Sequence, residues 1–545
     1  MLDTEFPKSI PEVTRQVVEP LLKGESLYAF LGEQAPRILD ETEMAGWYSG
    51  EGRPGIHPLI LMLVLIFQFV EDVPDRLAAE MAVMRLDWKY ALRQELTWSG
   101  FHYSDLCNFR KRLVANHAWH RVFEQVLSYL QTHGYVQAKG KQRTDSTAVL
   151  GQVARLSRLE LVWESLRLAV EAVVSADAVW SLQQLPPSFI AEHSRKRMDY
   201  RLKPAAVKTA LQKAGEEATW LLKAIEQSAV DWQTDEALHV LRRVVSEQFE
   251  TNAAGKLQAR TDTDACGDVL VSPHETEARY GKKGDKGWLG YKVQVTESVD
   301  PDGGFITDVA VTATALTDTE ALAPIQQRLV ARDLAPTQHY VDRGYMSAEN
   351  IVASTEQGID LRGRVLSDTS AHPAAFQHAA FQLDPLQRQA TCPAGNVSVS
   401  WRTYPEPKKG VSAEIRFGTQ CRTCPFFGEG QCTTNPLGRF LYLNPHSELL
   451  AARRRAAQTP EFKHEMMQRQ GIEATMAEWV GVHGGRRARY RGTLKLSLQA
   501  SLIASAINLK RLARRLARAT TPHPFFLPLV RPRFISSSGF FNRHT

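Results

Sequence analysis

Residues 1–138 carry a helical pattern of apolar and polar positions throughout. Pro58 can begin a helix that Leu59–Val70 fills, because its missing N–H would be unpaired in a first turn anyway. Asp72-Val73-Pro74 ends this helix, and Ser104 is expected to cap a later one through its hydroxyl. The pattern therefore predicts an N-terminal helical domain over residues 1–138.

The pattern changes twice after this segment. From Gly151 to about Glu250 the chain is rich in Leu, Ala, Glu and Arg without strand-like alternation, which predicts a helical insertion large enough to be a separate lobe. Apolar and polar residues then alternate from Leu289 to Thr296, which predicts a strand. Asp300–Gly304 is a strong turn signal, so Phe305–Thr312 is expected to return as the second strand of a hairpin.

A helix and another strand follow the hairpin. Thr317-x-x-Glu320 has the form of a capping box at a helix start. Gln338–Val341 is typical of a strand and leads into Asp342. The order of strand, insertion, hairpin, helix and strand indicates an α/β core.

The end of the chain combines an apolar stripe with basic charge. Leucines at helical spacing form the stripe: Leu498, Leu502, Leu509, Leu512 and Leu516. From His483 to Thr545 there are 13 Lys and Arg residues and no Asp or Glu, so the rest of the chain holds 53 basic and 60 acidic residues. An acidic bulk with one basic end is typical of a protein that binds a polyanion through that end. A solvated tail is the alternative interpretation.

Length and composition limit the class of protein. A chain of 545 residues suggests about three or four structural units, and an apolar fraction of 43% is ordinary for a soluble protein. The longest apolar run, Leu59–Phe67, falls well short of the roughly 20 residues that a membrane span needs, and no signal peptide pattern is present. We therefore expect a cytoplasmic protein with no membrane partner.

Three acids stand in settings that suit metal binding. Asp145 and Asp342 lie in or beside strands, whereas Glu473 follows Arg469 by one helical turn. Acids that converge from separate elements can hold two divalent cations roughly 3.5–4 Å apart, which clamp the attacking and leaving oxygens of a phosphodiester. Each acid also has a structural interpretation. The two aspartates can be turn or cap residues, and Glu473 can form an exposed ion pair with Arg469.

The order Asp, Asp, Glu, with the flanks Thr144–Thr147 and Tyr340–Tyr345, resembles the DDE transposases of bacterial insertion sequences, most closely the 1182 group. The last motif of that group is Tyr-x2-Arg-x3-Glu-x6-Lys. Arg469 and Glu473 match it, but Met466 stands at its Tyr position and Val480 at its Lys position. The resemblance covers nearly the whole chain, and the two departures leave all three acids in place.

The resemblance implies a fold and a set of domains. It implies a ribonuclease-H-like α/β core, a mixed sheet with helices, over residues 139–520. A helical insertion at 151–258 and a cysteine-bearing insertion at 349–457 would interrupt this core, and a basic tail would follow at 521–545. The helical segment 1–138 would be a DNA-binding domain, resembling the N-terminal domain of many such transposases; a dimerisation bundle is the alternative interpretation.

The resemblance also implies an activity. The protein would cut the ends of its own element with metal-activated water and join the freed 3′-hydroxyl to target DNA. Asp145, Asp342 and Glu473 would be the catalytic residues and would hold two Mg²⁺ (or Mn²⁺) ions. The partners would be double-stranded DNA, as terminal inverted repeats and as target, and further copies of the chain in a homo-oligomer on DNA.

Two other classes of function stay open. A zinc-containing DNA-binding regulator, or an inactive transposase relic, would share the basic end and the cysteines but would need no convergent acids. A metal-dependent nuclease would cut DNA without joining it. Cleavage of DNA that carries the element's ends, assayed with and without Mg²⁺, separates these classes.

Four of the six cysteines cluster in the second insertion: Cys392, Cys421, Cys424 and Cys432. A Cys-x2-Cys pair with two further cysteines has a known zinc spacing, because the tight turn aims two thiolates at one metal. Disulfides are not expected in a cytoplasmic protein. The cluster therefore predicts a structural zinc site, with reduced free thiols as the alternative.

Basic residues in three segments are candidates for DNA phosphate contacts. The first segment lies in the N-terminal domain, the second follows the helix of the third acid, and the third lies on the last helix. With Arg469, the candidates are Arg110, Lys111, Arg112, Arg486, Arg487, Arg489, Arg491, Arg511, Arg514, Arg515 and Arg518.

Overall fold

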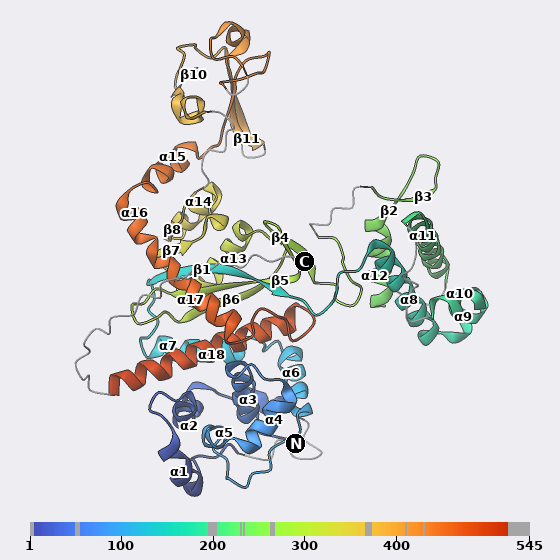
Figure 1. Cartoon of the computed structure of the whole chain (residues 1–545), viewed down its shortest axis with the longest axis vertical. Helices are drawn as coiled ribbons and strands as arrows, with labels where there is room; N and C mark the ends of the chain where they lie inside the picture. The colour runs from blue at the N-terminus through green and yellow to red at the C-terminus, as the bar shows by residue number, and fades with distance from the viewer. Residues whose placement is uncertain are drawn as a thin grey trace, which may run out of the picture.

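The computed structural model describes residues 5–48, 55–194, 204–228, 232, 235–261, 268–365, 373–408, 411–428 and 431–520. The predicted basic tail, 521–545, lies outside the described residues. The chain is a mixed α/β protein. Figure 1 shows a sheet in the middle, the N-terminal helices below it, a helical lobe on one side, and a strand-rich subdomain at the far end from the N-terminal helices.

Short helices fill the N-terminal part of the chain. They are α1 (Glu12–Val18), α2 (Leu27–Ile38), α3 (Pro58–Val70), α4 (Asp75–Met84), α5 (Leu86–Ala91), α6 (Ser104–Ala115) and α7 (Arg121–Thr132). Pro58 lies in the first turn of α3, as predicted. The prediction that Ser104 caps α6 is wrong. The N-cap residue is Tyr103, so Ser104 already lies inside the helix, and its hydroxyl bonds to the His102 ring at 2.7 Å.

The central sheet contains β1 (Lys141–Leu150), β4 (Arg279–Lys283), β5 (Lys286–Ser298), β6 (Ile306–Ala313), β7 (Gln338–Val341) and β8 (Asp360–Arg362). The order β4-β5-β1-β7-β8 places β1 between an antiparallel neighbour, β5, and a parallel neighbour, β7. β6 pairs with the same long strand β5, and β8 pairs in parallel with β7. The predicted β5–β6 hairpin is confirmed.

Two helices connect the parallel strands. α13 (Asp318–Ala331) joins β6 to β7, and the predicted capping box of Thr317 and Glu320 is present at its start. α14 (Ala348–Glu356) joins β7 to β8. Because β8 belongs to the central sheet, the core continues beyond residue 349, where the second insertion was predicted to begin.

The helical lobe contains α8 (Arg158–Ala176), α9 (Ala178–Gln184), α10 (Pro187–His193), α11 (Pro204–Glu226) and α12 (Glu236–Gln248), followed by the hairpin β2 (Phe249–Thr251) and β3 (Leu257–Ala259). Residues 382–443, here the Cys-bearing subdomain, contain β9 (Gln382–Asp384), β10 (Gln389–Thr391), β11 (Ser400–Lys408), β12 (Val411–Arg416) and β13 (Phe440–Leu443). Each body has hydrophobic clusters of its own. The two insertions are therefore packed units rather than loops.

Four helices complete the chain: α15 (Ser447–Ala456), α16 (Pro460–Glu465), α17 (Met467–Gly481) and α18 (Thr493–Thr520). α17 packs against β1 and β7, while α18 lies between β6 and the N-terminal helices α3 and α7 (Figure 1). Of the predicted leucine stripe, Leu498, Leu502, Leu509 and Leu512 are buried. One hydrophobic cluster includes residues of α3, β5 and α18, so the N-terminal helices share a core with the sheet. Among the described residues, no helix is both long and apolar enough to cross a bilayer.

One polar contact fixes α18 to the edge of the sheet. The buried Asn508 side chain accepts a hydrogen bond from the N–H of Ile306 at 2.7 Å and donates one to the carbonyl of Ile306 at 2.9 Å. The amide thus replaces a neighbouring strand at the first residue of β6. Without it, two buried backbone groups would be unpaired.

We expect Asn508→Leu to lower the free energy of unfolding by about 2–6 kcal/mol, because each buried group left unpaired costs about 1–3 kcal/mol. Urea unfolding followed by tryptophan fluorescence measures the change. The same substitution at the exposed Asn116 is the control and should change stability by less than about 1 kcal/mol. Equal effects at the two positions would contradict this role of Asn508.

Candidate active site

The strand register brings the first two acids together. Asp145 lies within β1, and Asp342 is the residue that follows β7. These strands run in parallel with Thr144 opposite Val341, so the next residue on each strand is an aspartate. Ligand sites form where parallel strands end, because the chain opens there into loops. Asp145 and Asp342 therefore lie side by side at one end of the parallel pair.

A helix brings the third acid to the same place. Arg469 of α17 lies 3.4 Å from an Asp145 oxygen through Nη1 and 3.2 Å from a Glu473 oxygen through Nη2. The side chain of Glu473 is 63% exposed. The i, i+4 ion pair is therefore present, but the same guanidinium also reaches across to β1. It is a bridge between the helix and the strand.

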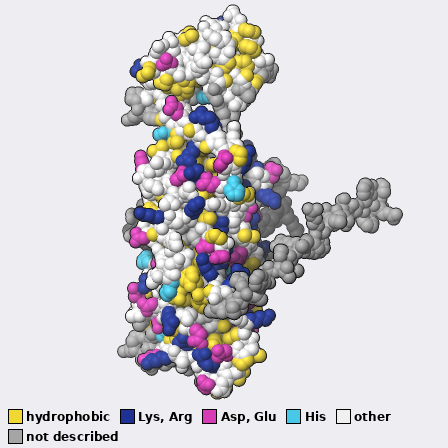
Figure 2. Space-filling view, turned by 90° about the vertical axis from the view of Figure 1, so that its left-hand side faces the viewer, with side chains coloured by type: hydrophobic (Ala, Val, Ile, Leu, Met, Phe, Trp, Pro, Cys, Tyr) yellow, Lys and Arg dark blue, Asp and Glu magenta, His cyan; other side chains and the backbone are white. Residues whose placement is uncertain are grey.

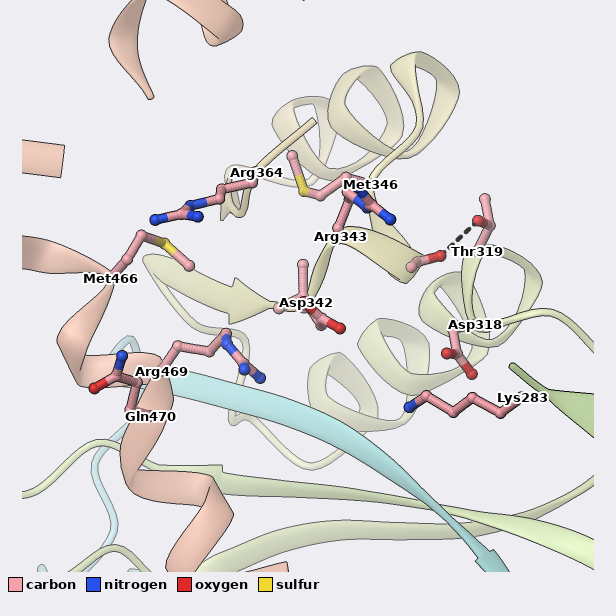
Figure 3. Close-up of a pocket in the computed structure, with 12 residues that line it drawn as sticks. Lys283, Asp318, Thr319, Asp342, Arg343, Met346, Arg364, Met466, Arg469 and Gln470 are labelled. Carbon is pink, nitrogen blue, oxygen red and sulfur yellow. Dashed lines mark hydrogen bonds between the residues drawn. The ribbon is translucent and has the colours of Figure 1, made fainter. Parts of the chain in front are cut away.

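An open pocket of about 700 Å³ lies beside these acids. Asp342 is at its centre in Figure 3, with Arg469 and Arg364 on one side and Asp318 and Lys283 on the other. Asp318 is the first residue of α13. Its carboxylate accepts a hydrogen bond from Ser146, the neighbour of Asp145, at 3.3 Å, and lies 3.4 Å from the ammonium of Lys292. The pocket thus has acids on its strand and helix edges and basic side chains around them.

Burial and mutual repulsion act on the acids. Burial raises the pKa of Asp145 above its ordinary value, and the nearby Asp342 adds to the rise, while Arg469 and Lys283 oppose it. Burial also raises the pKa of Tyr345, and Asp318, Asp145 and Asp342 contribute to that shift. Three carboxylates thus share one electrostatic environment, where a bound cation would favour their charged forms.

The donor set suits Mg²⁺ or Mn²⁺, which favour carboxylate oxygens. The described side chains are not arranged to bind either ion, because no three His, Cys, Asp or Glu residues among them lie close enough together to hold one. Arg469 occupies the space between Asp145 and Glu473, and Lys283 points into the pocket beside Asp318 (Figure 3). Metal binding would therefore require these cationic side chains to turn aside.

A buried charge network sets the position of α17. Glu297 of β5 is fully buried and accepts hydrogen bonds from Arg143 at 2.6 Å, Arg511 at 2.9 Å and the Thr475 hydroxyl at 2.5 Å. Arg143 lies two residues before Asp145 and also donates to the Gln468 carbonyl at 2.7 Å. The network ties β1, β5, α17 and α18 together beneath the two catalytic candidates Asp145 and Glu473.

A glycine lets α17 approach this network closely. A Cβ atom on Gly471 would lie 1.9 Å from Nη1 of Arg143, nearer than any contact that atoms tolerate. The Arg143 guanidinium cannot simply swing away, because Glu297 and the Gln468 carbonyl both hold it. The close approach of helix to strand at this point is what lets Arg469 reach Asp145.

The four predicted zinc ligands also meet. Cys392, Cys421, Cys424 and Cys432 line one small cavity of about 10 Å³ in the Cys-bearing subdomain, and all four are free thiols. The backbone N–H of Asn396 approaches the Cys392 sulfur at 3.3 Å, and that of Arg439 approaches the Cys421 sulfur at 3.5 Å. The thiols are therefore close neighbours, although they do not have the spacing of a formed metal site.

Several predicted DNA contacts are engaged inside the protein. Arg110 pairs with Asp75, Arg489 donates to the Val73 carbonyl at 2.7 Å, and Arg515 lies 3.0 Å from Asp300. With Arg511 on Glu297 and Arg469 between Asp145 and Glu473, five of the predicted arginines hold elements of the fold together. These arginines are therefore engaged with groups of the protein itself, and their contact with DNA phosphates stays a prediction. Sequence alone shows a basic face but not the acids that the fold brings opposite it.

The remaining candidates are available at the surface. Arg112 stacks on the ring of Tyr48, 4.3 Å from its centroid. The segment of Arg486 runs beside the end of β1, since the Leu150 N–H donates to the Arg486 carbonyl at 2.9 Å. The exposed side chains are those of Lys111, Arg486, Arg487, Arg491, Arg514 and Arg518.

Sequence reasoning missed several pocket residues. Asp318 was passed over because Thr317 and Glu320 around it explain the helix start as a capping box. Its position just after a core strand was the signal that could have identified it. Lys283, Arg343 and Arg364 carry no motif, and only the folded sheet brings them to Asp342.

Two family models match parts of the chain. One is described as "Transposase DDE domain" and matches residues 391–513, which include Glu473 and the four clustered cysteines. The other, "Transposase domain (DUF772)", matches residues 19–112 in the N-terminal helices. No curated protein and no solved structure matches the chain.

The buried network allows a direct test of how α17 is held. Glu297→Gln should lower the free energy of unfolding by about 3–5 kcal/mol, because Arg143 would keep a buried charge without a counter-charge and Arg511 would keep only Glu478 as an acidic partner. Glu473→Gln makes the same chemical change at an exposed position and should alter stability by no more than about 0.5 kcal/mol. Chemical denaturation compares the two variants. Equal stabilities would mean that Glu297 does not hold α17 in place.

Proposed function

We propose that the chain is a DDE transposase of an insertion sequence, which cuts the ends of its element and joins the freed 3′-hydroxyl to target DNA. The observations that carry this proposal are that the parallel register of β1 and β7 brings Asp145 beside Asp342 and that Arg469 pairs with both Asp145 and Glu473. The alternative of a DNA-binding regulator gives no reason for three acids from three elements to converge. The sheet order, with β6 and β1 on either side of β5 and with β7 and β8 following β1, supports a ribonuclease-H-like core.

The proposed chemistry needs little beyond positioning and charge. A pair of Mg²⁺ or Mn²⁺ ions, when bound, would activate water and stabilise the attacking and leaving oxygens. Asp145, Asp342 and Glu473 would hold these ions, and Asp318 lies near enough to Asp145 to orient its neighbour Ser146. Lys283 and Arg343 would offset the charge of the scissile phosphate from the pocket wall. No covalent protein intermediate is required, because phosphoryl transfer depends on alignment and charge stabilisation.

DNA would reach this site from surfaces that remain free. The N-terminal helices would bind the element ends, with Lys111 on the exposed side of α6. Arg486 lies beside β1, with its guanidinium 3.2 Å from the Ala148 carbonyl, and is placed to contact phosphates close to Asp145. Holding two DNA ends together would require at least two copies of the chain.

We also propose that the four cysteines bind a structural zinc ion. Burial raises the pKa of Cys432 to about 11; the Arg439 guanidinium opposes the rise, and Cys421 and Cys392 add to it. Without metal the Cys432 thiol is therefore protonated at neutral pH, and zinc would displace its proton. The backbone N–H groups at Cys392 and Cys421 suit thiolate sulfurs, as the outer contacts of metal sites do.

The activity is tested by removing each acid in turn. Asp145→Ala, Asp342→Ala and Glu473→Ala should each abolish Mg²⁺-dependent cleavage of DNA carrying the element's ends, while DNA affinity stays near that of the unchanged protein. Asp302→Ala, at a surface acid with 71% exposure, should leave cleavage intact. Full cleavage by any of the three variants would remove that residue from the site. Binding without cleavage by the unchanged protein would favour the regulator.

Zinc is tested on the purified full chain. Elemental analysis should find about one zinc per chain, as four thiolates bind one tetrahedral ion. Cys421→Ser with Cys424→Ser should lose it, whereas Cys107→Ser, at an exposed thiol of the N-terminal helices, should retain it. A chain that contains no zinc, and whose melting temperature a chelator leaves unchanged, would show that the cysteines are simple thiols.

A further inference from the structure

A second hollow adjoins the catalytic pocket. It has a volume of about 910 Å³ and lies between the end of β8, the Cys-bearing subdomain and α15. Arg364, just beyond β8, lines both this hollow and the pocket that contains Asp342. We call the second hollow the strand groove. A polymer that leaves the catalytic pocket past Arg364 would enter it directly.

Two arginines beside the strand groove form ion pairs inside the protein. Arg453 lies 3.2 Å from Asp360, and Arg362 lies 3.2 Å from Glu465. These pairs join β8 to α15 and α16 and so fix the walls of the groove. Arg364 and Arg455, each two residues further along its own segment, line the groove and are exposed.

The charge of these two outer arginines is not neutralised locally. Within the described part of the chain, no carboxylate lies within ion-pair distance of Arg364 or Arg455, and Glu448 is the one acid among the described residues that line the groove. Figure 2, which looks toward the side of α15 and α16, shows Lys and Arg side chains interspersed with acidic ones below the subdomain, where the molecule narrows. Arg364 and Arg455 therefore bring positive charge to the groove.

The floor of the strand groove is apolar and partly aromatic. Phe381, Leu383 and Leu450 line it, and Tyr442 of β13 stands at its edge with 52% of its surface exposed. A duplex presents phosphates and groove edges, and its bases are stacked inside. An apolar floor therefore offers a duplex no favourable contact. A single strand presents both phosphates and open base faces, which basic and aromatic side chains bind together.

We infer that the strand groove binds a single DNA strand that leaves the cleavage site. Arg364 and Arg455 contact its phosphates, and Tyr442 stacks on a base. This inference rests on the proposed function, because it takes the adjoining pocket to be the place of cutting. It adds that the DNA next to the cut is unpaired and that the Cys-bearing subdomain and α15 hold one of its strands.

Fluorescence anisotropy of the full chain tests this with two probes. One is a blunt duplex, and the other is the same duplex with a single-stranded overhang of about 10 nucleotides, within the usual size of a single-strand site. The overhang should increase the affinity of the unchanged protein. Arg364→Gln with Arg455→Gln should remove that increase, with a smaller loss of affinity for the blunt duplex. The salt dependence of the overhang probe should weaken by about 0.7 per lost phosphate contact.

A separate variant tests the base contact. Tyr442→Ala should weaken binding of the overhang probe by at least about fivefold, the lower end of base–aromatic stacking, without altering its salt dependence. The matched control for charge is Lys208→Gln with Lys223→Gln, which removes two exposed positive charges from α11 of the helical lobe. The control should preserve the gain from the overhang.

Two results would overturn the inference. If the arginine double variant loses equal affinity for both probes, the two arginines are general duplex contacts. If the double variant keeps the full gain in affinity from the overhang, the groove does not bind DNA. The failure of the proposed function is distinguishable from either result. Suppose that the unchanged protein never cuts DNA, yet the double variant still loses the affinity gained from the overhang. The proposed single-strand groove would then stand, and only the proposed transposase activity would fail.

Discussion

The arrangement of this molecule depends on one buried carboxylate. Glu297 lies on β5, next to the strand that carries Asp145, and is bound by arginines from β1 and from α18. A buried charge of this kind is costly unless all its oxygens are paired, and here Thr475 of α17 completes the set. Because the three partners come from three elements, satisfying Glu297 fixes where α17 lies. The third acid of the site is therefore positioned by a residue that never touches the pocket.

The site itself combines a rigid part with an adjustable one. Asp145 and Asp342 are fixed by the register of two parallel strands, which cannot slip without moving every side chain of β1. Glu473 is exposed, and an ion pair with Arg469 at 3.2 Å holds its side chain. For the proposed binding of cations and then DNA, the site needs one part that stays fixed and one that can turn. In this chain the strand acids are the fixed part and the helix acid is the part that can turn.

Local patterns predicted local features well. The hairpin, the capping box at α13 and the strand Gln338–Val341 follow from alternation and turn residues over a few positions. The sequence could not predict contacts between residues that lie far apart along the chain. Arg511 was assigned to DNA because its helix is basic, whereas its partner Glu297 lies 214 positions earlier. β8 was missed because a strand of 3 residues has almost no pattern of its own.

The shared core of the N-terminal helices and the sheet has a mechanical consequence. α18 is packed against α3 and α7 on one side and β6 on the other, so the two parts share one packed core. If the N-terminal helices bind an element end, the distance between the bound DNA segment and Asp342 is fixed by the packed core of the protein. One base pair inserted between the gripped sequence and the cut would displace the scissile phosphate by about 3.4 Å and rotate it around the helix axis. A rigid protein cannot follow that displacement. The number of base pairs between the bound sequence and the cleavage point would therefore be selected as strictly as the sequence itself.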